Sequence, residues 1–267
     1  MTPFADLHCH TTHSDGTATP EEILDLAKKK GFKGVSITDH DTATAYPGLF
    51  EKAEEMGLEL ITGVEFSCQH KGVSVHVLGY HFDINANPIN GLFTRHKARR
   101  EERNAQIFEK LKNRNIDVTF DDIRHYGGVL GRPHIALALM EKGYVASVRE
   151  AFNKYLAEGK SCYAPGHPVS VEETIDVIQT SGGKAVIAHP HLLNSPKTLQ
   201  DLLQMPFDGM ETKYANFSEE KNKRWEDLAQ RKGWLETAGS DYHGTIKPTL
   251  HYGASYVDEA KFRKLQS

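Results

Sequence analysis

Short apolar runs alternate with amphipathic segments along most of this chain. Runs rich in β-branched residues predict strands at 34–38, 58–66, 73–80, 184–188, 209–212 and 235–238. Apolar residues at helical spacing predict helices at 20–30, 43–56, 171–180, 198–203 and 218–232. Thr19 is expected to cap the first helix, with Pro20 at its first position and Gly31 ending it. Strands that alternate with helices favour parallel βαβ units and therefore an α/β fold.

The middle of the chain departs from this alternation. Residues 90–114 form a long, strongly charged stretch with helical spacing, and the chain shows little strand pattern from there to residue 165. Further helices are predicted at 121–125, 133–142 and 147–156. We therefore expect residues 92–165 to be a small helical domain inserted into an α/β domain made of residues 1–91 and 166–267. The charges at 95–103 predict mainly a solvated helix face, with at most a modest role in guiding short oligonucleotides.

Composition excludes several classes of protein. The chain has 267 residues, of which 39% are hydrophobic and 25% charged, so it is long enough to bury a sizeable core. Because 32 Lys and Arg residues face 36 Asp and Glu residues, there is no global basic field to hold long nucleic acid. No apolar run reaches the about 18 residues of a membrane span, and no signal-peptide pattern is visible. Cys9, Cys68 and Cys162 are far apart, which favours reduced thiols in a cytoplasmic protein.

Histidine is the unusual residue, with 15 in the chain, and many lie near the ends of predicted strands. His8 and His10 are two residues apart in a segment that starts as a strand, so both are expected to point to the same face. Asp241 and His243 repeat this spacing after the last predicted strand. The remaining polar residues of this kind are Asp15, His40, Glu65, His76 and His189. Since the carboxyl ends of strands share one face in a β/α barrel, we expect these side chains to gather there.

Each of these clusters has an ordinary structural explanation when it is taken alone. A single strand histidine such as His76 is more often a hydrogen-bonded core residue, and Asp15–Gly16 is most simply a turn. Unpaired buried carboxylates and imidazoles at all of these places would be costly, and shared metal coordination removes that cost. Imidazole and carboxylate ligands without a thiolate suit Mn²⁺, Fe²⁺ or Zn²⁺. The set is large enough for two to three divalent ions.

Taken in order, the motifs resemble those of the polymerase and histidinol phosphatase (PHP) superfamily. The matching segments are 6–11 (DLHCHT), 14–16 (SDG), 38–40 (TDH), 63–65 (GVE), His76, 188–190 (AHP) and 240–243 (SDYH). The resemblance implies a distorted (β/α)7 barrel with a trinuclear metal centre, which the helical insertion covers. The ligands that it implies are His8, His10, Glu65 and Asp241 for the first ion; Glu65, His76 and His189 for the second; and Asp15, His40 and His243 for the third.

Two features are similar to the branch of this superfamily that contains 3',5'-nucleoside bisphosphate phosphatases and 5'-to-3' exoribonucleases. Position 15 is Asp, where the histidinol phosphatase branch tends to have His, and residues 131–134 read GRPH. An arginine forms paired bonds with phosphate oxygens, and Pro133 suits the start of a helix whose free N–H groups favour an anion. Arg132 and His134 are therefore expected to bind a substrate phosphate. Weaker candidates for phosphate binding are Lys160, His167 and His191.

Together these residues predict a metal-dependent phosphoesterase. A water shared by two ions loses its proton near neutral pH and becomes the nucleophile, so no serine or cysteine nucleophile is needed. His191, two residues after His189, is expected as the general acid. The expected substrate is a nucleoside 3',5'-bisphosphate or the 5' end of a short single-stranded oligonucleotide. We expect the protein to bind neither a membrane nor a stable protein partner. The alternatives are a histidinol-phosphate phosphatase and a non-catalytic, metal-binding accessory module.

Overall fold

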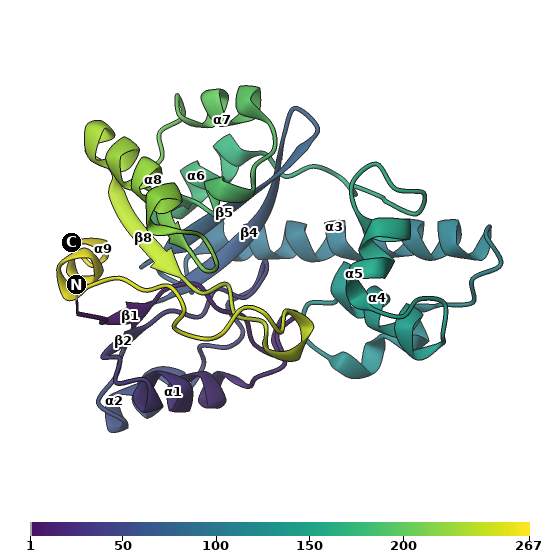
Figure 1. Ribbon diagram of the computed structural model, residues 1–267, viewed down its shortest axis with the longest axis horizontal. Helices are drawn as coiled ribbons and strands as arrows, with labels where there is room; N and C mark the ends of the chain where they lie inside the picture. Colours follow the sequence, from purple (N-terminus) through teal and green to yellow (C-terminus); the bar gives the residue numbers. More distant parts are fainter. Residues whose placement is uncertain (1) are drawn as a thin grey trace.

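The computed structural model describes residues 2–267 and shows a mixed α/β body with helices above and below its strands, while the helices from the middle of the chain project to one side (Figure 1). Its strands are β1 (Ala5–Asp6), β2 (Gly34–Val35), β3 (Glu59–Leu60), β4 (Gly63–His70), β5 (Val73–Tyr80), β6 (Lys184–Ile187), β7 (Gly209–Tyr214) and β8 (Leu235–Gly239). Its α-helices are α1 (Pro20–Lys29), α2 (Leu49–Glu55), α3 (Asn87–Lys112), α4 (Arg132–Glu141), α5 (Val148–Ala151), α6 (Val171–Thr180), α7 (Pro196–Leu202), α8 (Glu219–Lys232) and α9 (Glu259–Leu265). Within these residues, no helix is both long and apolar enough to cross a membrane.

The strands form two sheets. β1, β2 and β3 pair in parallel, with Ala5 opposite Gly34 and Gly34 opposite Glu59. The second sheet has the order β4-β5-β6-β7-β8, in which the first two pairs are antiparallel and the last two are parallel. A two-residue turn joins β4 to β5, and both of its residues, Lys71 and Gly72, have positive φ, at 48° and 83°. The prediction of parallel units is therefore wrong for this hairpin and for the β5–β6 pair.

The two sheets do not join into a closed barrel. Strand pairing between them is limited to single parallel bridges, Cys9 with Tyr242 and His40 with Glu65, beside isolated backbone hydrogen bonds such as that from the Leu7 N–H to the Ala238 carbonyl at 3.2 Å. These bridges lie beyond the carboxyl ends of β1 and β2, where the chain continues toward the predicted metal ligands. The expected (β/α)7 barrel is therefore not closed among the described residues, whose strands form two separate sheets joined by isolated bridges.

The local sequence explains where the helices begin. Thr19 caps α1 as predicted, because its hydroxyl accepts from the Glu22 N–H at 3.2 Å and the Glu22 carboxylate accepts from the Thr19 N–H at 2.7 Å. The helix predicted over 43–56 begins only at Leu49. Pro47 disfavours a helical conformation in the residue before it, and Gly48 has a φ of 75°, so the chain turns here before the helix starts. The predicted helix over 43–56 is thus too long at its N-terminal side.

A second hydrophobic core lies among the helices in the middle of the chain. Ile107 and Leu139 belong to this core, which draws its buried residues from positions 107–164. Ile89, in the first turn of α3, belongs instead to the main core beside the sheets. α3 therefore contributes residues to both cores, and it continues without a break through residue 92, the predicted domain boundary. The division into two domains at residues 92 and 165 stays a prediction. The helix predicted at 121–125 is a pair of 3₁₀ turns, Phe120–Asp122 and Arg124–Tyr126.

Candidate metal centre

Two segments with predicted ligands two residues apart follow β1 and β8 and lie next to each other. β1 leads into His8 and His10, and β8 leads into Asp241 and His243. The Asp241 N–H donates to the His8 carbonyl at 2.7 Å, so the two segments run side by side. A Cβ atom on Gly239 would lie 2.3 Å from the His8 Cβ, and only glycine therefore lets β8 pass so close to His8.

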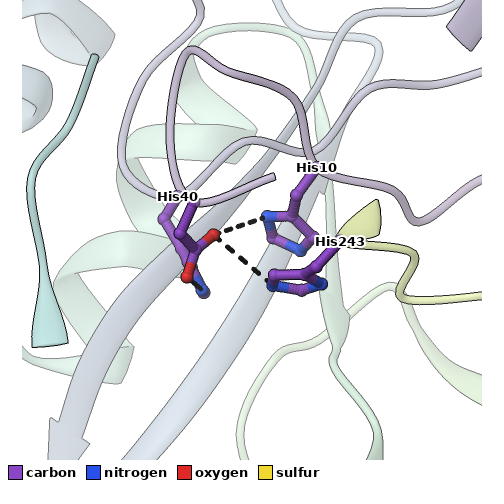
Figure 2. Close-up of side chains that lie close together, drawn as sticks. His10, His40 and His243 are labelled. Carbon is purple, nitrogen blue, oxygen red and sulfur yellow. Dashed lines mark ion pairs between the residues drawn. The ribbon is translucent and has the colours of Figure 1, made fainter. Parts of the chain in front are cut away.

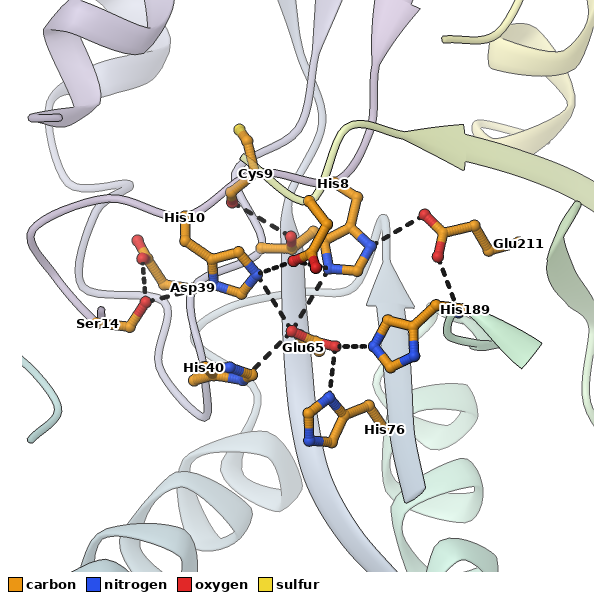
Figure 3. A network of polar contacts seen from close by, with 12 residues as sticks. His8, Cys9, His10, Ser14, Asp39, His40, Glu65, His76, His189 and Glu211 are labelled. Atoms are coloured by element: carbon orange, nitrogen blue, oxygen red, sulfur yellow. Dashed lines mark hydrogen bonds and ion pairs between the residues drawn. The ribbon is translucent and has the colours of Figure 1, made fainter. Parts of the chain in front are cut away.

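Glu65 lies at the centre of five imidazole rings (Figure 3). Its Oε2 atom is 3.4 Å from His8 Nε2, 3.1 Å from His10 Nε2 and 3.3 Å from His40 Nδ1. Its Oε1 atom is 2.7 Å from His76 Nδ1 and 2.8 Å from His189 Nε2. The two oxygens of one carboxylate thus face different groups of imidazoles. This arrangement is the one needed by a carboxylate that bridges two ions.

Three groups of candidate ligand atoms converge, and within each group the atoms lie within 4.8 Å of one another. The groups are His8, His10, Glu65 and Asp241; His10, Asp15, His40 and His243; and His40, Glu65 and His76. The first group has the composition that was predicted for the first ion. The second group contains the three residues predicted for the third ion and also His10. Figure 2 shows His10, His40 and His243 around a carboxylate, and the ion pairs identify this carboxylate as that of Asp15. His189 is outside these groups, although it reaches Glu65.

The spacing of these atoms suits divalent ions better than direct hydrogen bonds. His8 Nε2, His10 Nε2, His40 Nδ1 and His243 Nε2 are buried and have no hydrogen-bond partner. Each lies 3.1–3.4 Å from a carboxylate oxygen. Two ligands that are each about 2.1 Å from one ion lie about 3.0–3.4 Å apart at tetrahedral or octahedral angles. The donor set therefore fits metal ions, and an ion would satisfy nitrogens that are otherwise costly to bury.

The electrostatic state of the cluster favours cations. Burial favours the neutral form of Glu65, but the surrounding histidines outweigh it and hold the pKa of Glu65 well below its usual range. The same balance of burial against neighbouring positive groups keeps the pKa values of Asp15 and Asp241 well below normal. Burial lowers the pKa of His10, yet its contacts with Asp241 and Glu65 raise that pKa to about 9. The carboxylates are thus ionised, and a bound ion must displace a proton from His10.

Glu211 is a supporting residue that the sequence analysis missed. It is fully buried on β7, its Oε1 atom is 2.9 Å from His8 Nδ1, and its Oε2 atom accepts from the His189 N–H at 2.8 Å. A carboxylate on one ring nitrogen fixes the tautomer and directs the other nitrogen toward the metal. The available signal was an acidic residue inside the predicted strand 209–212, between Met210 and Thr212.

Arg132 faces the same space as two of the predicted ligands. It begins α4 and lines a cavity of about 200 Å³ together with His76 and His189. Its guanidinium carbon lies 5.9 Å from the ring centre of Phe152 and 5.5 Å from that of Tyr163. These aromatic faces attract the cation and limit the directions in which it can point. The position is suited to the predicted role in phosphate binding.

His134 and His191 have other partners in the structure. His134 is buried, and its Nδ1 atom accepts from the Gly131 N–H at 3.0 Å at the start of α4. His191 Nε2 is 3.0 Å from Asn222 Oδ1, and its ring packs against Trp225. Among residues 2–267, no hydrogen bond or ion pair joins His191 to a predicted metal ligand, so its role as general acid stays a prediction, as does phosphate binding by His134. The weaker candidates Lys160 and His167 are exposed at the surface.

The prediction of a solvated face at 95–103 is wrong for three of its arginines. Arg99, Arg100 and Arg103 have 6%, 7% and 6% of their surface exposed. Arg100 pairs with Asp41 at 2.6 Å, whereas Arg99 Nε and two nitrogens of Arg103 have no partner. Burial, followed by the charges of Arg100, Arg132 and Arg99, lowers the pKa of Arg103 well below its usual range. Arg99, Arg100 and Arg103 thus place three guanidinium groups near the single carboxylate of Asp41, and the excess of positive charge would suit an anion.

Comparisons with known proteins identify the family of this chain. Residues 6–163 match the family model described as the PHP domain. The 5'-3' exoribonuclease Rnm of Salmonella typhimurium is 35% identical over 89% of this chain and 84% of its own length. The 3',5'-nucleoside bisphosphate phosphatase of Chromobacterium violaceum is 30% identical over 89% and 86%. A structure from Bifidobacterium adolescentis, assigned as a metal-dependent phosphoesterase, has a TM-score of 0.89 at 32% identity and covers 99% of this chain and 96% of its own. The chain therefore belongs to the PHP domain family.

Proposed function

We propose that this PHP-family hydrolase of phosphoric esters cleaves a phosphate ester that has a second phosphate close to it on the same molecule. Nucleoside 3',5'-bisphosphates and the 5' ends of short single-stranded oligonucleotides both have this arrangement. The observation that carries the proposal is the cavity lined by His76, His189 and Arg132, in which predicted metal ligands and a phosphate-binding cation face each other. The similar proteins of Salmonella typhimurium and Chromobacterium violaceum are named for these two activities.

Two to three divalent ions, of Mn, Fe or Zn, are the proposed cofactors. The residues that would hold them are His8, His10, Glu65 and Asp241; Asp15, His40 and His243 with His10; and Glu65, His76 and His189. Bound divalent ions supply Lewis acidity, which lowers the pKa of coordinated water to near neutral and offsets negative charge on the phosphoryl group. Glu65 presents one carboxylate oxygen to each of two groups of imidazoles, so it would help to hold more than one ion.

The arginines position the phosphate that is not cleaved. The guanidinium of Arg132 donates two parallel hydrogen bonds to phosphate oxygens, and the rings of Phe152 and Tyr163 hold its plane. Arg99 and Arg103 add positive charge behind it. Anchoring one phosphate fixes where the second ester lies relative to the metal ligands, which lowers the entropy lost on reaching the transition state.

In the proposal, the fold positions the metal ligands and Arg132 on the two sides of the bound substrate. The two sheets are assigned to one distorted (β/α)7 barrel that is open between them, and the ligands project from the end where the sheets meet. Arg132 comes from the helical segment 92–165, which is therefore proposed to cover the substrate. Such a cover excludes water, and this strengthens the electrostatic interactions inside the site.

Product release by the Mn²⁺-loaded protein tests the substrate class. The substrates are nucleoside 3',5'-bisphosphates, short 5'-phosphorylated RNAs, nucleoside 5'-monophosphates and histidinol phosphate. The first two are expected to be turned over faster than the compounds with a single phosphate, because only they occupy both parts of the cavity. Faster turnover of histidinol phosphate would instead support the alternative phosphatase and refute the proposal.

Arg132→Ala tests the anchor. For a bisphosphate, KM is expected to rise by about 10- to 100-fold while kcat falls less, since a hydrogen bond to a charged group contributes about 1.5–3 kcal/mol. Arg124→Ala, which removes an exposed arginine paired with Asp121, is the matched control and is expected to change neither constant. Equal effects of Arg132→Ala on a singly phosphorylated substrate would contradict the anchoring role.

The alternative of a non-catalytic module is tested with His40→Asn. His40 contributes to two of the three ligand groups, so its loss is expected to reduce both metal content and activity. Metal content is measured by elemental analysis and activity by phosphate release. An unchanged rate in this variant would count against a mechanism that uses the whole cluster.

A further inference from the structure

Asp241 is a predicted metal ligand whose two carboxylate oxygens have different neighbours. The Oδ1 atom is 3.4 Å from His8 Nε2 and 3.3 Å from His10 Nε2. The Oδ2 atom accepts a hydrogen bond of 2.6 Å from the Tyr214 hydroxyl and one of 2.8 Å from Lys247 Nζ. One oxygen therefore faces the place of the ions, while the other is held by a phenol and an ammonium group.

Lys247 is a partly exposed residue that contacts the buried metal centre through Asp241. Among residues 2–267, it is the one lysine or arginine that forms an ion pair with a predicted ligand. Its side chain is 41% exposed, whereas that of Asp241 is 3% exposed. An ammonium group has three N–H donors, and the hydrogen bond to Asp241 uses one of them. Two donors are thus available to a molecule that enters from solvent.

Orienting the Asp241 carboxylate is not a sufficient reason for a lysine at position 247. Tyr214 is buried and already donates to the same oxygen, so the carboxylate is oriented without the lysine. Ions bound near Oδ1 would offset the negative charge of Asp241 and weaken its attraction for the ammonium group. A phosphate monoester that reaches the metal centre carries close to two negative charges at neutral pH, which the ammonium group of Lys247 can pair with instead.

We propose that Lys247 contacts the phosphoryl group being cleaved and donates a charge-assisted hydrogen bond to one of its non-bridging oxygens, while Tyr214 holds Asp241. The inference rests on the proposed function, since it needs a phosphate ester at the metal centre. A fixed cationic donor at this position stabilises the negative charge that builds up on the phosphoryl oxygens in the transition state. Lys247 follows the 3₁₀ turn Gly244–Ile246, directly after the ligand His243.

Phosphate binding tests the contact without turnover. Lys247→Met removes the charge and keeps an unbranched side chain, and calorimetric titration of inorganic phosphate into the Mn²⁺-loaded protein gives Kd. We expect Kd to rise about 10-fold, and kcat for a nucleoside 3',5'-bisphosphate to fall about 100-fold, with unchanged Mn²⁺ content. Lys247→Arg keeps the charge and is expected to recover part of the phosphate affinity. The matched control is Lys71→Met, which removes a lysine paired with Asp201 at 2.7 Å on the surface and is expected to change neither quantity.

The outcomes separate this inference from the proposed function. Wild-type phosphate affinity in Mn²⁺-saturated Lys247→Met overturns the inference, and a simultaneous loss of Mn²⁺ affinity would show that the lysine only supports Asp241. Tyr214→Phe is expected to have the reverse pattern, with weaker Mn²⁺ binding and unchanged phosphate affinity once the site is saturated. A wild-type protein that binds phosphate through Lys247 but fails to hydrolyse bisphosphates would refute the substrate class and leave the contact standing.

Discussion

Glu211 shows how a buried carboxylate can act on a metal centre without being one of its ligands. Its contact with His8 Nδ1 leaves His8 Nε2 as the ring nitrogen that faces Glu65 and Asp241. A negative partner also raises the basicity of the imidazole, and burial of the pair away from water makes this effect stronger. The charge of Glu211 is therefore expected to set the affinity of the first ion.

Glu211→Gln keeps the size of the side chain and removes that charge. Mn²⁺ affinity, measured by calorimetric titration, is expected to fall by about 10- to 100-fold, which is the usual effect of removing such a partner. Glu59→Gln, which changes an exposed glutamate paired with Arg263, is the control and is expected to leave Mn²⁺ affinity unchanged. Equal Mn²⁺ affinity of Glu211→Gln and the wild type would show that orientation of His8 comes from packing alone.

Cys9 lies between two ligands in the sequence but points away from them. It is completely buried in the main core, and its Sγ atom donates to the Ser36 carbonyl at 3.4 Å. Cys9→Ser is expected to leave kcat within about twofold, while the free energy of unfolding falls by about 1 kcal/mol because a hydroxyl is costlier to bury than a thiol. Steady-state kinetics and thermal unfolding measure the two effects. A large loss of kcat with normal metal content would contradict the packing role.

The single residues that could be predicted are those whose position follows from the strand pattern. His8 and His10 could be placed on one face because alternate strand residues share a face. Glu211 could not be assigned to His8, since 203 residues separate them and only the pairing of strands brings them together. The same holds for Tyr214 and Lys247, whose shared partner Asp241 is known only once β7 and β8 lie side by side.

At the scale of elements, α3 departs most from what its sequence indicates. Charged residues at 95–103 usually mark a helix face in water, yet α3 passes between two cores and is covered on one side. Residues 99 and 103 are four positions apart and residues 100 and 103 are three apart, so helical spacing places Arg103 beside both of the others on that covered side. The burial of Arg103 without an ion pair is a cost to stability, and the proposed binding of a substrate phosphate nearby would account for that cost.

Arg103→Met therefore separates stability from binding. Replacing a buried, unpaired cation by an apolar side chain of similar length is expected to leave the free energy of unfolding unchanged or to raise it by about 1–4 kcal/mol. The same variant is expected to bind a nucleoside 3',5'-bisphosphate more weakly, because the positive charge behind Arg132 is reduced. Thermal unfolding and calorimetric titration measure these effects, with the exposed Lys97→Met on the same helix as control. A clear loss of stability would show that Arg103 serves the fold instead.

For the molecule as a whole, the sequence indicates the α/β class of the fold more reliably than it indicates whether the strands close into a barrel. Alternating strands and helices predict α/β organisation because each apolar strand needs helices to cover it. The hairpin at Lys71–Gly72 reverses the chain within a short polar turn that was not recognised, and this makes the second sheet mixed. Closure depends on the pairing between distant segments, such as Cys9 with Tyr242, and local pattern does not determine that pairing.

The charge state of the metal centre also acts on the stability of the whole protein. His10 has a folded-state pKa raised to about 9 from 6.5, because Asp241 and Glu65 outweigh the effect of burial. A group with a raised pKa stabilises the folded state fully below its unfolded value, and this contribution is lost as the pH rises through the folded value. In the metal-free protein, the stabilisation by protonated His10 therefore declines between pH 6.5 and about 9.

The stabilisation by bound metal ions is expected to increase with pH, because the ions bind the deprotonated imidazole and their affinity rises from pH 6.5 to about 9. The difference in Tm between Mn²⁺-loaded and EDTA-treated protein should therefore widen from pH 6.5 to pH 9, as measured by differential scanning calorimetry in buffers of equal ionic strength. Proton release on Mn²⁺ binding, obtained from titrations in buffers of different ionisation enthalpy, should decrease toward pH 9 as His10 loses its proton beforehand. His125→Gln, which changes a histidine in the exposed 3₁₀ turn Arg124–Tyr126, is the control and should keep the wild-type trend. A Tm difference that stays constant with pH would mean that the ions do not compete with protons for His10.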